Sequence, residues 1–141
     1  MAVMLIRSFR SPHRSHASDW GQSMVELALF LPILLIVALG ATDLARGYYA
    51  DVQVREAAFK GATYGAASTT QAADSAGIRT AALDGGTLIA SPTVTSSTAA
   101  DTSGGTAVAV TVRSSFSTLV PWPGVPNHLT VRHTTTAKVL Q

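Results

Sequence analysis

The stretch that decides the fold is GQSMVELALFLPILLIVALGAT, residues 21–42. Residues 27–41 contain no charged side chain, and Glu26 is the only one in the longer stretch. Built as a helix, residues 22–42 would be roughly 31 Å long, about the thickness of the hydrocarbon core of a bilayer. A chain of 141 residues is too small to cover so apolar a helix on all sides. We therefore predict that residues 22–42 span a membrane.

Lipid is expected to surround this predicted span. A proline lies inside it, where it removes one backbone hydrogen bond and tends to kink the helix, which membrane helices tolerate better than soluble ones. The side chains that we take to represent the span are Leu27, Phe30, Pro32, Leu35 and Leu39.

Positive charge is concentrated ahead of the apolar stretch. Residues 1–21 carry three arginines against one acid, whereas residues 22–141 are balanced, and the formal net charge is +2. Cytoplasmic flanks of membrane helices are rich in Lys and Arg, so we expect the N-terminus in the cytoplasm and residues 43–141 across the membrane. With so little excess charge and no basic stripe, the chain is not expected to bind nucleic acid.

Three fates are open for the N-terminal segment. A secretory signal would be cut after small residues, a role that Ala38 and Gly40 fit, but here the preceding region is long and the apolar core begins with an acid. An uncleaved signal anchor would keep residues 1–21. The third fate depends on Glu26, because a carboxylate at the edge of a membrane helix is disfavoured unless it has a partner or a task.

Glu26 lies five residues after Gly21. If the chain were cut between Gly21 and Gln22, the new α-amine of Gln22 would be positively charged at neutral pH. Glu26 would then be the fifth residue of the mature chain and could pair with that amine on a neighbouring subunit. Gly21 and Gln22 are therefore the predicted processing site, and Glu26 is the predicted pairing residue. The competing interpretation is an incidental acid at the membrane interface.

This arrangement resembles the type IV prepilin signal, in which a basic leader, a glycine, a cleavage site and a glutamate at mature position five precede an apolar helix. Residues 21–66 further resemble the N-terminal signature of TadE-like pseudopilins of the tight-adherence (Tad/Flp) pilus system. The features that carry the resemblance are Gly21-Gln22, Val25-Glu26, Leu31-Pro32, Asp43, Arg46, Tyr48 and Gly61-Ala62-Thr63-Tyr64. Leu27 stands where small Flp-type major pilins tend to have an aromatic residue, which favours a minor subunit.

The resemblance implies a membrane-anchored minor pseudopilin that a prepilin peptidase processes. Its implied partners are other pilin-like subunits and the Tad/Flp assembly machinery, which build pili for adhesion and biofilm formation. Its implied place is the bacterial cytoplasmic (inner) membrane, as a single-pass protein with an extracytoplasmic head, or the pilus itself. The alternative is an uncleaved signal-anchored envelope protein whose head binds a partner without filament assembly. A secreted domain freed by signal peptidase is a third reading.

The helical pattern continues beyond the predicted span. We expect one helix from about residue 24 to residue 67. Its outer half presents an apolar stripe made of Leu44, Tyr48, Val52, Phe59 and Ala62 or Ala66. Small residues along the same helix permit close approach of another helix. The candidate residues for packing between subunits are Tyr48, Gly61 and Gly65.

The remainder of the chain predicts a short helix and several strands. Ser68 and Gln71 fit a capping box that would open a second helix ending before residues 85–86. Alternating apolar and polar residues predict strands over 107–113 and 129–139, with a weaker strand over 87–95. Residues 101–105 read as a turn and residues 121–126 as a rigid loop.

Together these patterns predict an α+β fold of pilin-like type. A long N-terminal helix would pack its outer, amphipathic half against a small antiparallel β-sheet. The predicted regions are a basic cytoplasmic leader (1–21), a transmembrane helix (22–42), an extracytoplasmic helical region (43–84) and the β-sheet head (85–141).

The sequence carries no pattern that indicates catalysis. Of the four histidines, His13 and His16 lie in the basic leader, and His128 and His133 differ in parity on one predicted strand, so they face opposite ways. Phosphate-binding glycine loops, nucleophile elbows and close carboxylate pairs are not present. With no cysteine, thiolate metal sites are excluded as well. We expect a protein that is not an enzyme, with no cofactor, metal or small-molecule substrate.

Overall fold

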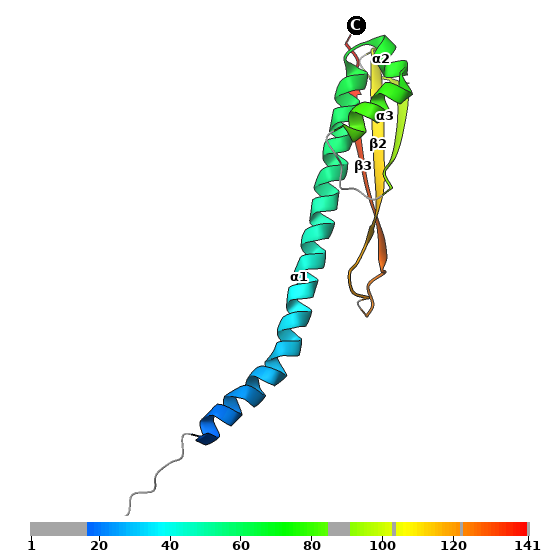
Figure 1. Cartoon of the computed structure of the whole chain (residues 1–141). Coiled ribbons are helices and arrows are strands. Elements are labelled where there is room, and N and C mark those ends of the chain that lie inside the picture. Colours follow the sequence, from blue (N-terminus) through cyan, green and yellow to red (C-terminus); the bar gives the residue numbers. More distant parts are fainter. Residues whose placement is uncertain (1–16, 85–90, 103, 122, 141) are drawn as a thin grey trace, which may run out of the picture. The chain divides into compact units, whose positions relative to one another are not determined.

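A computed structural model describes residues 17–84, 91–102, 104–121 and 123–140, with side chains from Gly21 onward. A long helix is followed by two short helices and a three-stranded antiparallel sheet of order β1-β2-β3 (Figure 1). The elements are α1 (Ala17–Ala66), α2 (Thr69–Ala73), α3 (Ser75–Leu83), β1 (Thr93–Ala100), β2 (Thr106–Ser117) and β3 (His128–Lys138). The predicted α+β fold, with a long N-terminal helix against a small antiparallel sheet, is confirmed.

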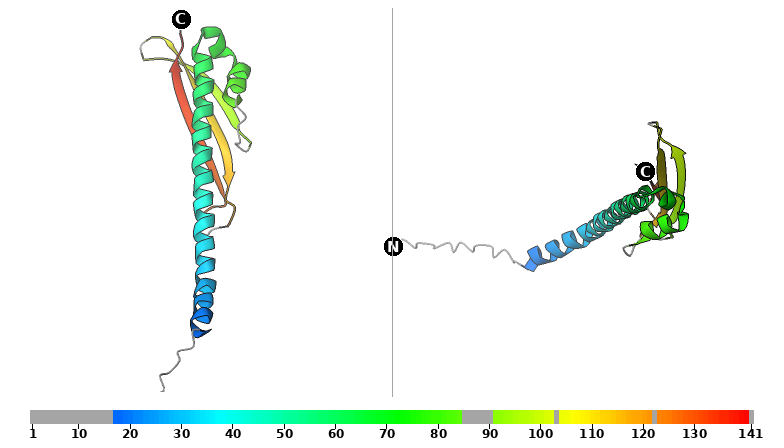
Figure 2. Two further views of the ribbon diagram at one scale, coloured as in Figure 1. Left: turned by 60° about the vertical axis from the view of Figure 1, so that its left-hand side comes forward. Right: turned by 90° about the horizontal axis from the view of Figure 1, so that it is seen from above.

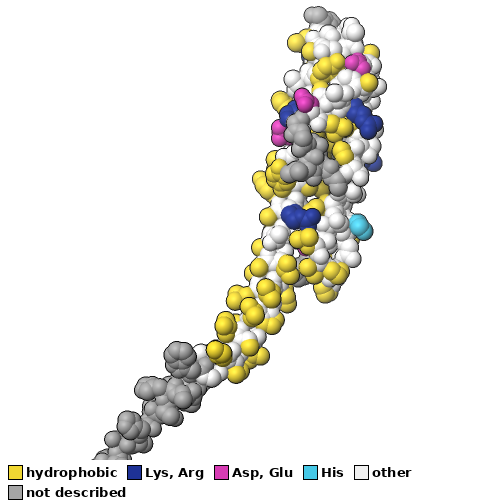
Figure 3. Space-filling model, viewed as in Figure 1, with side chains coloured by type: hydrophobic (Ala, Val, Ile, Leu, Met, Phe, Trp, Pro, Cys, Tyr) yellow, Lys and Arg dark blue, Asp and Glu magenta, His cyan; other side chains and the backbone are white. Residues whose placement is uncertain are grey.

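The chain divides within α1 into two units, Met1–Ala38 and Leu39–Gln141. In the first unit, every described side chain from residue 21 to residue 38 is exposed. Figure 3 shows these side chains to be mostly hydrophobic. Among the described residues, α1 is the one helix that is long and apolar enough to cross a membrane. The candidate span predicted from the sequence is therefore present as a helix whose described side chains from residue 21 to residue 38 are exposed.

The helix α1 begins seven residues earlier than predicted, at Ala17 rather than near residue 24. Nothing between residues 17 and 23 stops a helix, since this segment has no proline and Gly21 only lowers the helix propensity. The other end agrees with the prediction within one residue. The N–H of Ala67 donates to the carbonyl of Tyr64 at 3.3 Å, which closes the last turn.

The core of the second unit lies between the outer part of α1, the helix α3 and the sheet. Its fully buried large side chains are few, and each stabilises the fold by about 1.5–3 kcal/mol. They are Val54 from α1, Ile78 from α3, and Val108, Val110 and Val112 from β2. Ala57, Ala58, Ala62, Ala72 and Val139 complete the core.

The face of α1 that packs on the sheet includes Ala62 of the apolar stripe that the sequence suggests, but not the large side chains of that stripe. Leu44 and Tyr48 are 76% and 71% exposed, and Phe59 is 62% exposed. The buried face instead carries small side chains such as Ala58 and Ala62. A face of small residues brings the helix axis closer to the sheet, which compensates for the short valines opposite it.

Gly61 and Gly65 lie at the centre of this packing. A Cβ on Gly61 would come within 3.1 Å of both the Ala82 Cβ and the Val110 Cγ1. A Cβ on Gly65 would come within 3.1 Å of the Ile78 Cδ1 and 3.2 Å of the Val108 Cγ2. These two glycines therefore allow α1 to approach α3 and β2 of the same chain.

The single helix predicted after Ser68 is wrong, because the structure divides it at Asp74 into α2 and α3. The predicted N-cap is confirmed: the N–H of Gln71 donates to the Ser68 Oγ at 3.2 Å. Asp74 is a second N-cap, since its carboxylate accepts the N–H of Gly77 at 2.9 Å. An aspartate that caps the next helix leaves the helical conformation itself, which ends the first helix.

The strands pair in a meander. β1 pairs with β2 from Thr93↔Arg113 to Ala100↔Thr106, and β2 pairs with β3 from Ala107↔Lys138 to Ser117↔His128. The strand predicted over 87–95 was placed too early, because Pro92 has no N–H to donate and β1 begins just after it; residues 87–90 lie outside the described residues.

The predicted turn at 101–105 is confirmed. The N–H of Gly104 donates to the Asp101 carbonyl at 3.0 Å, and Gly104 adopts φ +81°, a conformation that favours glycine. In the loop between β2 and β3, Gly124 has φ +82°, which is also a conformation that favours glycine. Trp122 and residues 1–16 of the predicted leader lie outside the described residues.

Candidate functional site

The predicted processing and pairing residues all lie in the exposed first part of α1, and Gln22 and Glu26 share one side of the helix. Gly21 is open, with no atom within 4 Å of the position that a Cβ would take. The Gln22 Nε2 donates to the Glu26 Oε1 at 3.2 Å, one helical turn away. Across the described residues, the Glu26 carboxylate has no cationic partner. The structure therefore presents an accessible carboxylate whose neighbour is a neutral amide.

The five side chains chosen to represent the span all lie on the same uncovered helix. Leu27 is 62% exposed, Phe30 is 61% exposed and Leu35 is 54% exposed. Pro32 lies within α1, which continues through it. Large apolar side chains exposed all round a helix are not stable in water, so this surface requires an apolar environment.

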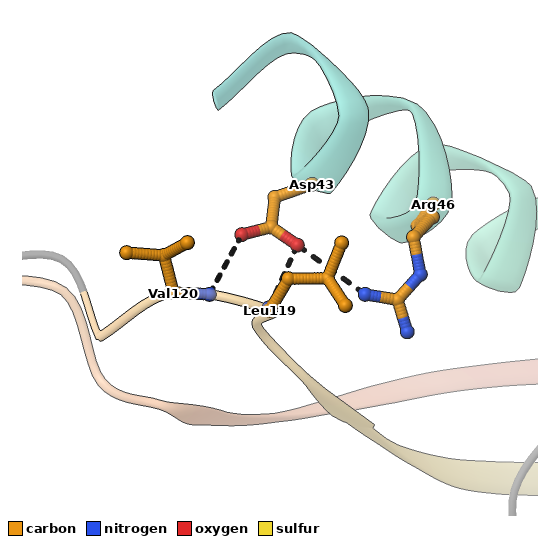
Figure 4. A network of polar contacts seen from close by, with 4 residues as sticks. All are labelled: Asp43, Arg46, Leu119 and Val120. Atoms are coloured by element: carbon orange, nitrogen blue, oxygen red, sulfur yellow. Dashed lines mark hydrogen bonds and ion pairs between the residues drawn. The ribbon is translucent and has the colours of Figure 1, made fainter. Parts of the chain in front are cut away.

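A buried carboxylate joins α1 to the loop between β2 and β3 in the second unit. Asp43 is only 6% exposed. Its Oδ1 accepts the N–H of Leu119 at 2.9 Å, and its Oδ2 accepts the N–H of Val120 at 3.4 Å. The Arg46 Nη1 donates to the Oδ1 at 3.3 Å. Figure 4 shows the carboxylate between the loop backbone and the guanidinium.

This network explains how a charge can be buried at this position. A desolvated carboxylate is costly unless hydrogen bonds and a counter-charge satisfy it, and Asp43 has both. The two backbone N–H groups that it accepts lie just beyond β2, where no strand partner takes them. Asp43 thus fixes the end of the β2–β3 hairpin to α1, one residue beyond the predicted span.

The guanidinium of Arg46 lies over an aromatic ring. Its Cζ is 5.4 Å from the centroid of Phe116, within the range of a cation–π contact. Gly47 lies against the same ring, since a Cβ there would be 3.7 Å from the Phe116 Cε1. A cavity of about 740 Å³ opens beside the pair, and its wall includes Tyr49 and His128.

From the sequence alone, Asp43 and Arg46 stand out only as parts of a family pattern. Their structural role is not predicted from it. A signal was available, because an acid directly follows an apolar run and a base lies three residues later. The partners of Asp43 are backbone groups 76 and 77 residues away in the chain. No periodicity in the sequence connects these positions.

The three candidate residues for packing between subunits have different surroundings. Tyr48 is exposed. Gly61 and Gly65 are covered by α3 and β2 of their own chain. A single chain does not test contacts between subunits, so that part of the expectation stays a prediction.

A tyrosine–aspartate pair holds the junction of α2 and α3 against α1. The Tyr64 Oη donates to the Asp74 Oδ2 at 3.0 Å. The N–H of Gly77 and the hydroxyl of Tyr64 lower the pKa of Asp74 below its usual value, because both stabilise the charged carboxylate. The same hydrogen bond to Asp74 raises the pKa of Tyr64. The pair is a structural cap rather than a reactive site.

The described histidines lie apart and do not form a shared site. His128 pairs with Ser117 and His133 with Val112, so the two side chains lie on opposite faces of the sheet, as their parity predicts. Within the described part of the chain, no group of three or more His, Asp or Glu side chains is arranged to hold a metal ion.

These features define an α+β protein whose first helix contains a candidate membrane span. Residues 21–63 match the family model described as TadE-like protein, which confirms the resemblance seen in the sequence. The matched segment includes the candidate processing residues and Asp43 and ends before Gly65 and the sheet. Comparisons with curated proteins and with solved structures gave no match.

Proposed function

We propose that this chain is a membrane-anchored minor pilin-like subunit that takes part in the assembly of Tad/Flp pili. The TadE-like match over residues 21–63 supports a role related to Tad pili. The observation that carries the proposal is Glu26, an accessible acid five residues after Gly21 at the head of an uncovered apolar helix. The role is structural, and its partners are a prepilin peptidase and other pilin-like subunits.

Processing would cut the chain between Gly21 and Gln22 at the cytoplasmic face of the inner membrane. The positive leader keeps that end in the cytoplasm, and the head is exported. Gly21 carries no side chain, and apart from its own stretch of helix no described atom lies within 4 Å of the position that a Cβ would take, which favours access for a peptidase. The bond lies in the second turn of α1, and helix ends open more readily than helix centres.

The cut creates a charge that the uncut chain lacks. Before processing, the side chain of Gln22 offers Glu26 only a neutral amide hydrogen bond. After processing, the α-amine of Gln22 is a cation, and Glu26 of a neighbouring subunit can pair with it inside the lipid. Pairing compensates two charges that would each be costly alone, and it aligns adjacent helices with a fixed stagger.

The exposed stripe on the outer part of α1 provides the second contact for assembly. Leu44, Tyr48 and Phe59 remain exposed beside the face of the helix that packs in the head. Contacts between helices that are not related by a closed rotation propagate into a filament. The stripe is therefore the surface on which other pilin-like subunits pack.

The second candidate function is an uncleaved signal-anchored envelope protein whose head binds a partner. One observation favours it: α1 begins at Ala17, so the bond between Gly21 and Gln22 lies within a helix. Proteases require an extended backbone, and an anchor that is never cut would keep this helix intact.

The mature N-terminus distinguishes these functions. Mass spectrometry of the protein purified from cell membranes is expected to give residues 22–141. A mass that includes the leader supports the uncleaved anchor, and a start near Ala41 supports a secreted domain. Either result contradicts the proposal.

The pairing role of Glu26 is tested by Glu26→Ala. We expect this variant to be processed but absent from the sheared pilus fraction, because the Gln22 amine has lost its counter-ion. Glu56→Ala is the matched control, since Glu56 is another exposed acid on α1 and pairs only with Lys60. Pilus incorporation of the Glu26→Ala variant at the level of the control would overturn the pairing role.

A further inference from the structure

One face of the sheet is left uncovered by the helices. The helices lie on the other face, where Val108, Val110 and Val112 are buried (Figures 1 and 2). Side chains alternate across a strand, so residues 111, 113 and 115 of β2 point to the uncovered face together with their partners on β1 and β3.

Two arginines stand directly opposite each other on this outer face. Arg113 on β2 pairs with Arg132 on β3, and both side chains are exposed. Directly opposed residues of an antiparallel pair have Cα atoms roughly 4.5–5.5 Å apart. Neither guanidinium makes a hydrogen bond or an ion pair with any described residue. Like charges directly opposite each other destabilise a sheet, and an anion between them would remove that cost.

Hydroxyl groups surround the arginine pair. Thr93 lies opposite Arg113 on the β1 side, and Ser115 and Thr130 form the next outward pair along the hairpin. On the other side, the Thr111 and Thr134 hydroxyls are hydrogen-bonded at 2.8 Å. None of the outward positions of the three strands carries a carboxylate. The face offers the two opposed arginines and a row of hydroxyl donors and acceptors. Lys138, at the far end of β3, is a third outward cation, and it pairs with Asp101 at 3.9 Å.

We propose that Arg113 and Arg132 form a binding site for the oxyanions of an acidic polysaccharide. A guanidinium presents a planar fork of N–H donors that matches a carboxylate or a sulfate, and one anion between two forks removes their repulsion. The threonine and serine hydroxyls on both sides match the hydroxyl groups of neighbouring sugars. The sheet then acts as a flat platform along which a sugar chain lies.

Other anionic partners fit this face less well. The interior of a protein–protein interface is rich in aromatic and large apolar side chains, and the outward positions of the three strands carry none. A nucleic acid presents a long series of phosphates, which two arginines do not neutralise.

A lipid headgroup is also a poor fit. Leu119 is fixed to Asp43, one residue beyond the predicted span, and Arg113 lies six residues earlier on β2. The four strand steps from Arg113 to Ser117, where β2 ends, extend to about 13 Å, whereas each headgroup layer is only about 5–8 Å thick. The inference does not depend on the proposed role in pilus assembly.

The test uses the full chain in a non-ionic detergent and two fluorescent decasaccharides. One is a heparin fragment, which carries sulfates, and the other is a polygalacturonate fragment, which carries carboxylates. Fluorescence anisotropy gives the Kd. We expect Arg113→Gln or Arg132→Gln to raise the Kd for the bound decasaccharide about five-fold, and the double variant about twenty-fold or more.

The matched control replaces two leader arginines, Arg7→Gln and Arg10→Gln, and changes the net charge by the same amount. This control should keep the Kd of the unchanged chain. Circular dichroism and thermal melting of each variant establish that the head remains folded. A further variant, Arg113→Lys, keeps the charge but loses the fork, and its Kd should lie between those of the unchanged chain and Arg113→Gln.

Three results would overturn the proposal. The first is that neither decasaccharide binds the unchanged chain. The second is that the leader variant loses affinity as much as the Arg113/Arg132 double variant, which would assign the binding to the leader. The third is that nanodiscs of phosphatidylglycerol, but not of phosphatidylcholine, abolish binding to the reconstituted chain, which would assign the arginines to lipid headgroups.

Discussion

The helix α1 passes through two regions that treat apolar side chains in opposite ways. From residue 21 to residue 38, the large apolar side chains are exposed on all sides. From Val54 to Gly65, the helix buries mainly small side chains against α3 and β2. The same helix is therefore a candidate membrane span in one region and one layer of a packed head in the other.

This difference teaches that the two regions are stabilised by different surroundings. In the first unit, the described side chains of the helix are exposed, so its large apolar side chains need an apolar environment. In the second unit, stability comes from close approach, which glycine and alanine permit and which leaves few voids. A change in residue size or charge should have opposite consequences in the two regions.

The largest expected effect comes from charges placed in the predicted span. Leu34→Arg with Leu35→Arg should cost about 6 kcal/mol of insertion free energy, since each arginine at the centre of a span is disfavoured by about 3 kcal/mol. Extraction of cell membranes at alkaline pH measures the result, and the doubly substituted chain should leave the membrane fraction.

The matched control places the same charges on the exposed stripe of the head, as Leu44→Arg with Tyr48→Arg. These side chains are at least as exposed as Leu34 and Leu35. The control should remain in the membrane fraction. If both double variants are extracted alike, the distinction between the two regions is wrong.

The next largest effect is expected where the head depends on small residues. Gly61→Leu should lower the free energy of unfolding by about 3 kcal/mol, because even its Cβ would lie 3.1 Å from Ala82 and Val110. Thermal unfolding of the full chain in detergent, followed by circular dichroism, measures the change.

Thr63→Leu is the control for Gly61→Leu, because Thr63 is exposed on the same helix. Its effect should stay within about 0.5 kcal/mol. Equal unfolding free energies for Gly61→Leu and Thr63→Leu would show that the helix does not approach the sheet as closely as described.

A smaller effect is expected at the buried carboxylate. Asp43→Ala should lower the free energy of unfolding by about 2 kcal/mol, because the N–H groups of Leu119 and Val120 lose their acceptor. Amide hydrogen exchange at these two residues should accelerate more than exchange within β1. Unchanged protection at Leu119 would contradict the role of Asp43 in fixing the hairpin.

The smallest effect is expected from acid at the junction of α2 and α3. The pKa of Asp74 is lowered in the folded chain, so its contribution to stability is present above the ordinary aspartate value and is lost as the pH falls through the lowered value. Exchange of the Gly77 N–H should accelerate over this acidic range. Asp74→Asn should remove the pH dependence, and its persistence in that variant would assign it to another group.

Much of the fold could be predicted from the sequence, because local patterns determine it. The apolar run, the capping serine at Ser68 and the alternation over 107–113 each require only neighbouring residues. The break at Asp74 was missed because an aspartate inside a helical pattern can also cap a new helix. The start of β1 was placed too early because the apolar–polar alternation is weak before Pro92. It does not show that the strand begins only after this proline.

The packed face of α1 could not be predicted, and the reason is physical. Hydrophobicity favours Leu44, Tyr48 and Phe59 as the buried stripe, but the sheet presents valines that leave room for close approach. Small residues such as Ala58 and Ala62 are therefore buried against the sheet, and the larger apolar side chains remain exposed. The loop partners of Asp43 could not be predicted for a different reason: they are backbone N–H groups of a distant loop, and a backbone N–H leaves no pattern in the sequence.

The most direct test of the two-region account is a cysteine scan along α1, which the absence of native cysteine makes possible. Phe30→Cys, Leu35→Cys, Leu44→Cys and Tyr48→Cys are each reconstituted at low density in liposomes and treated with N-ethylmaleimide. The reagent requires a thiolate, which lipid disfavours and water permits. The account predicts modification of Leu44→Cys and Tyr48→Cys, and protection of Phe30→Cys and Leu35→Cys until detergent is added. Equal modification at all four positions would contradict it.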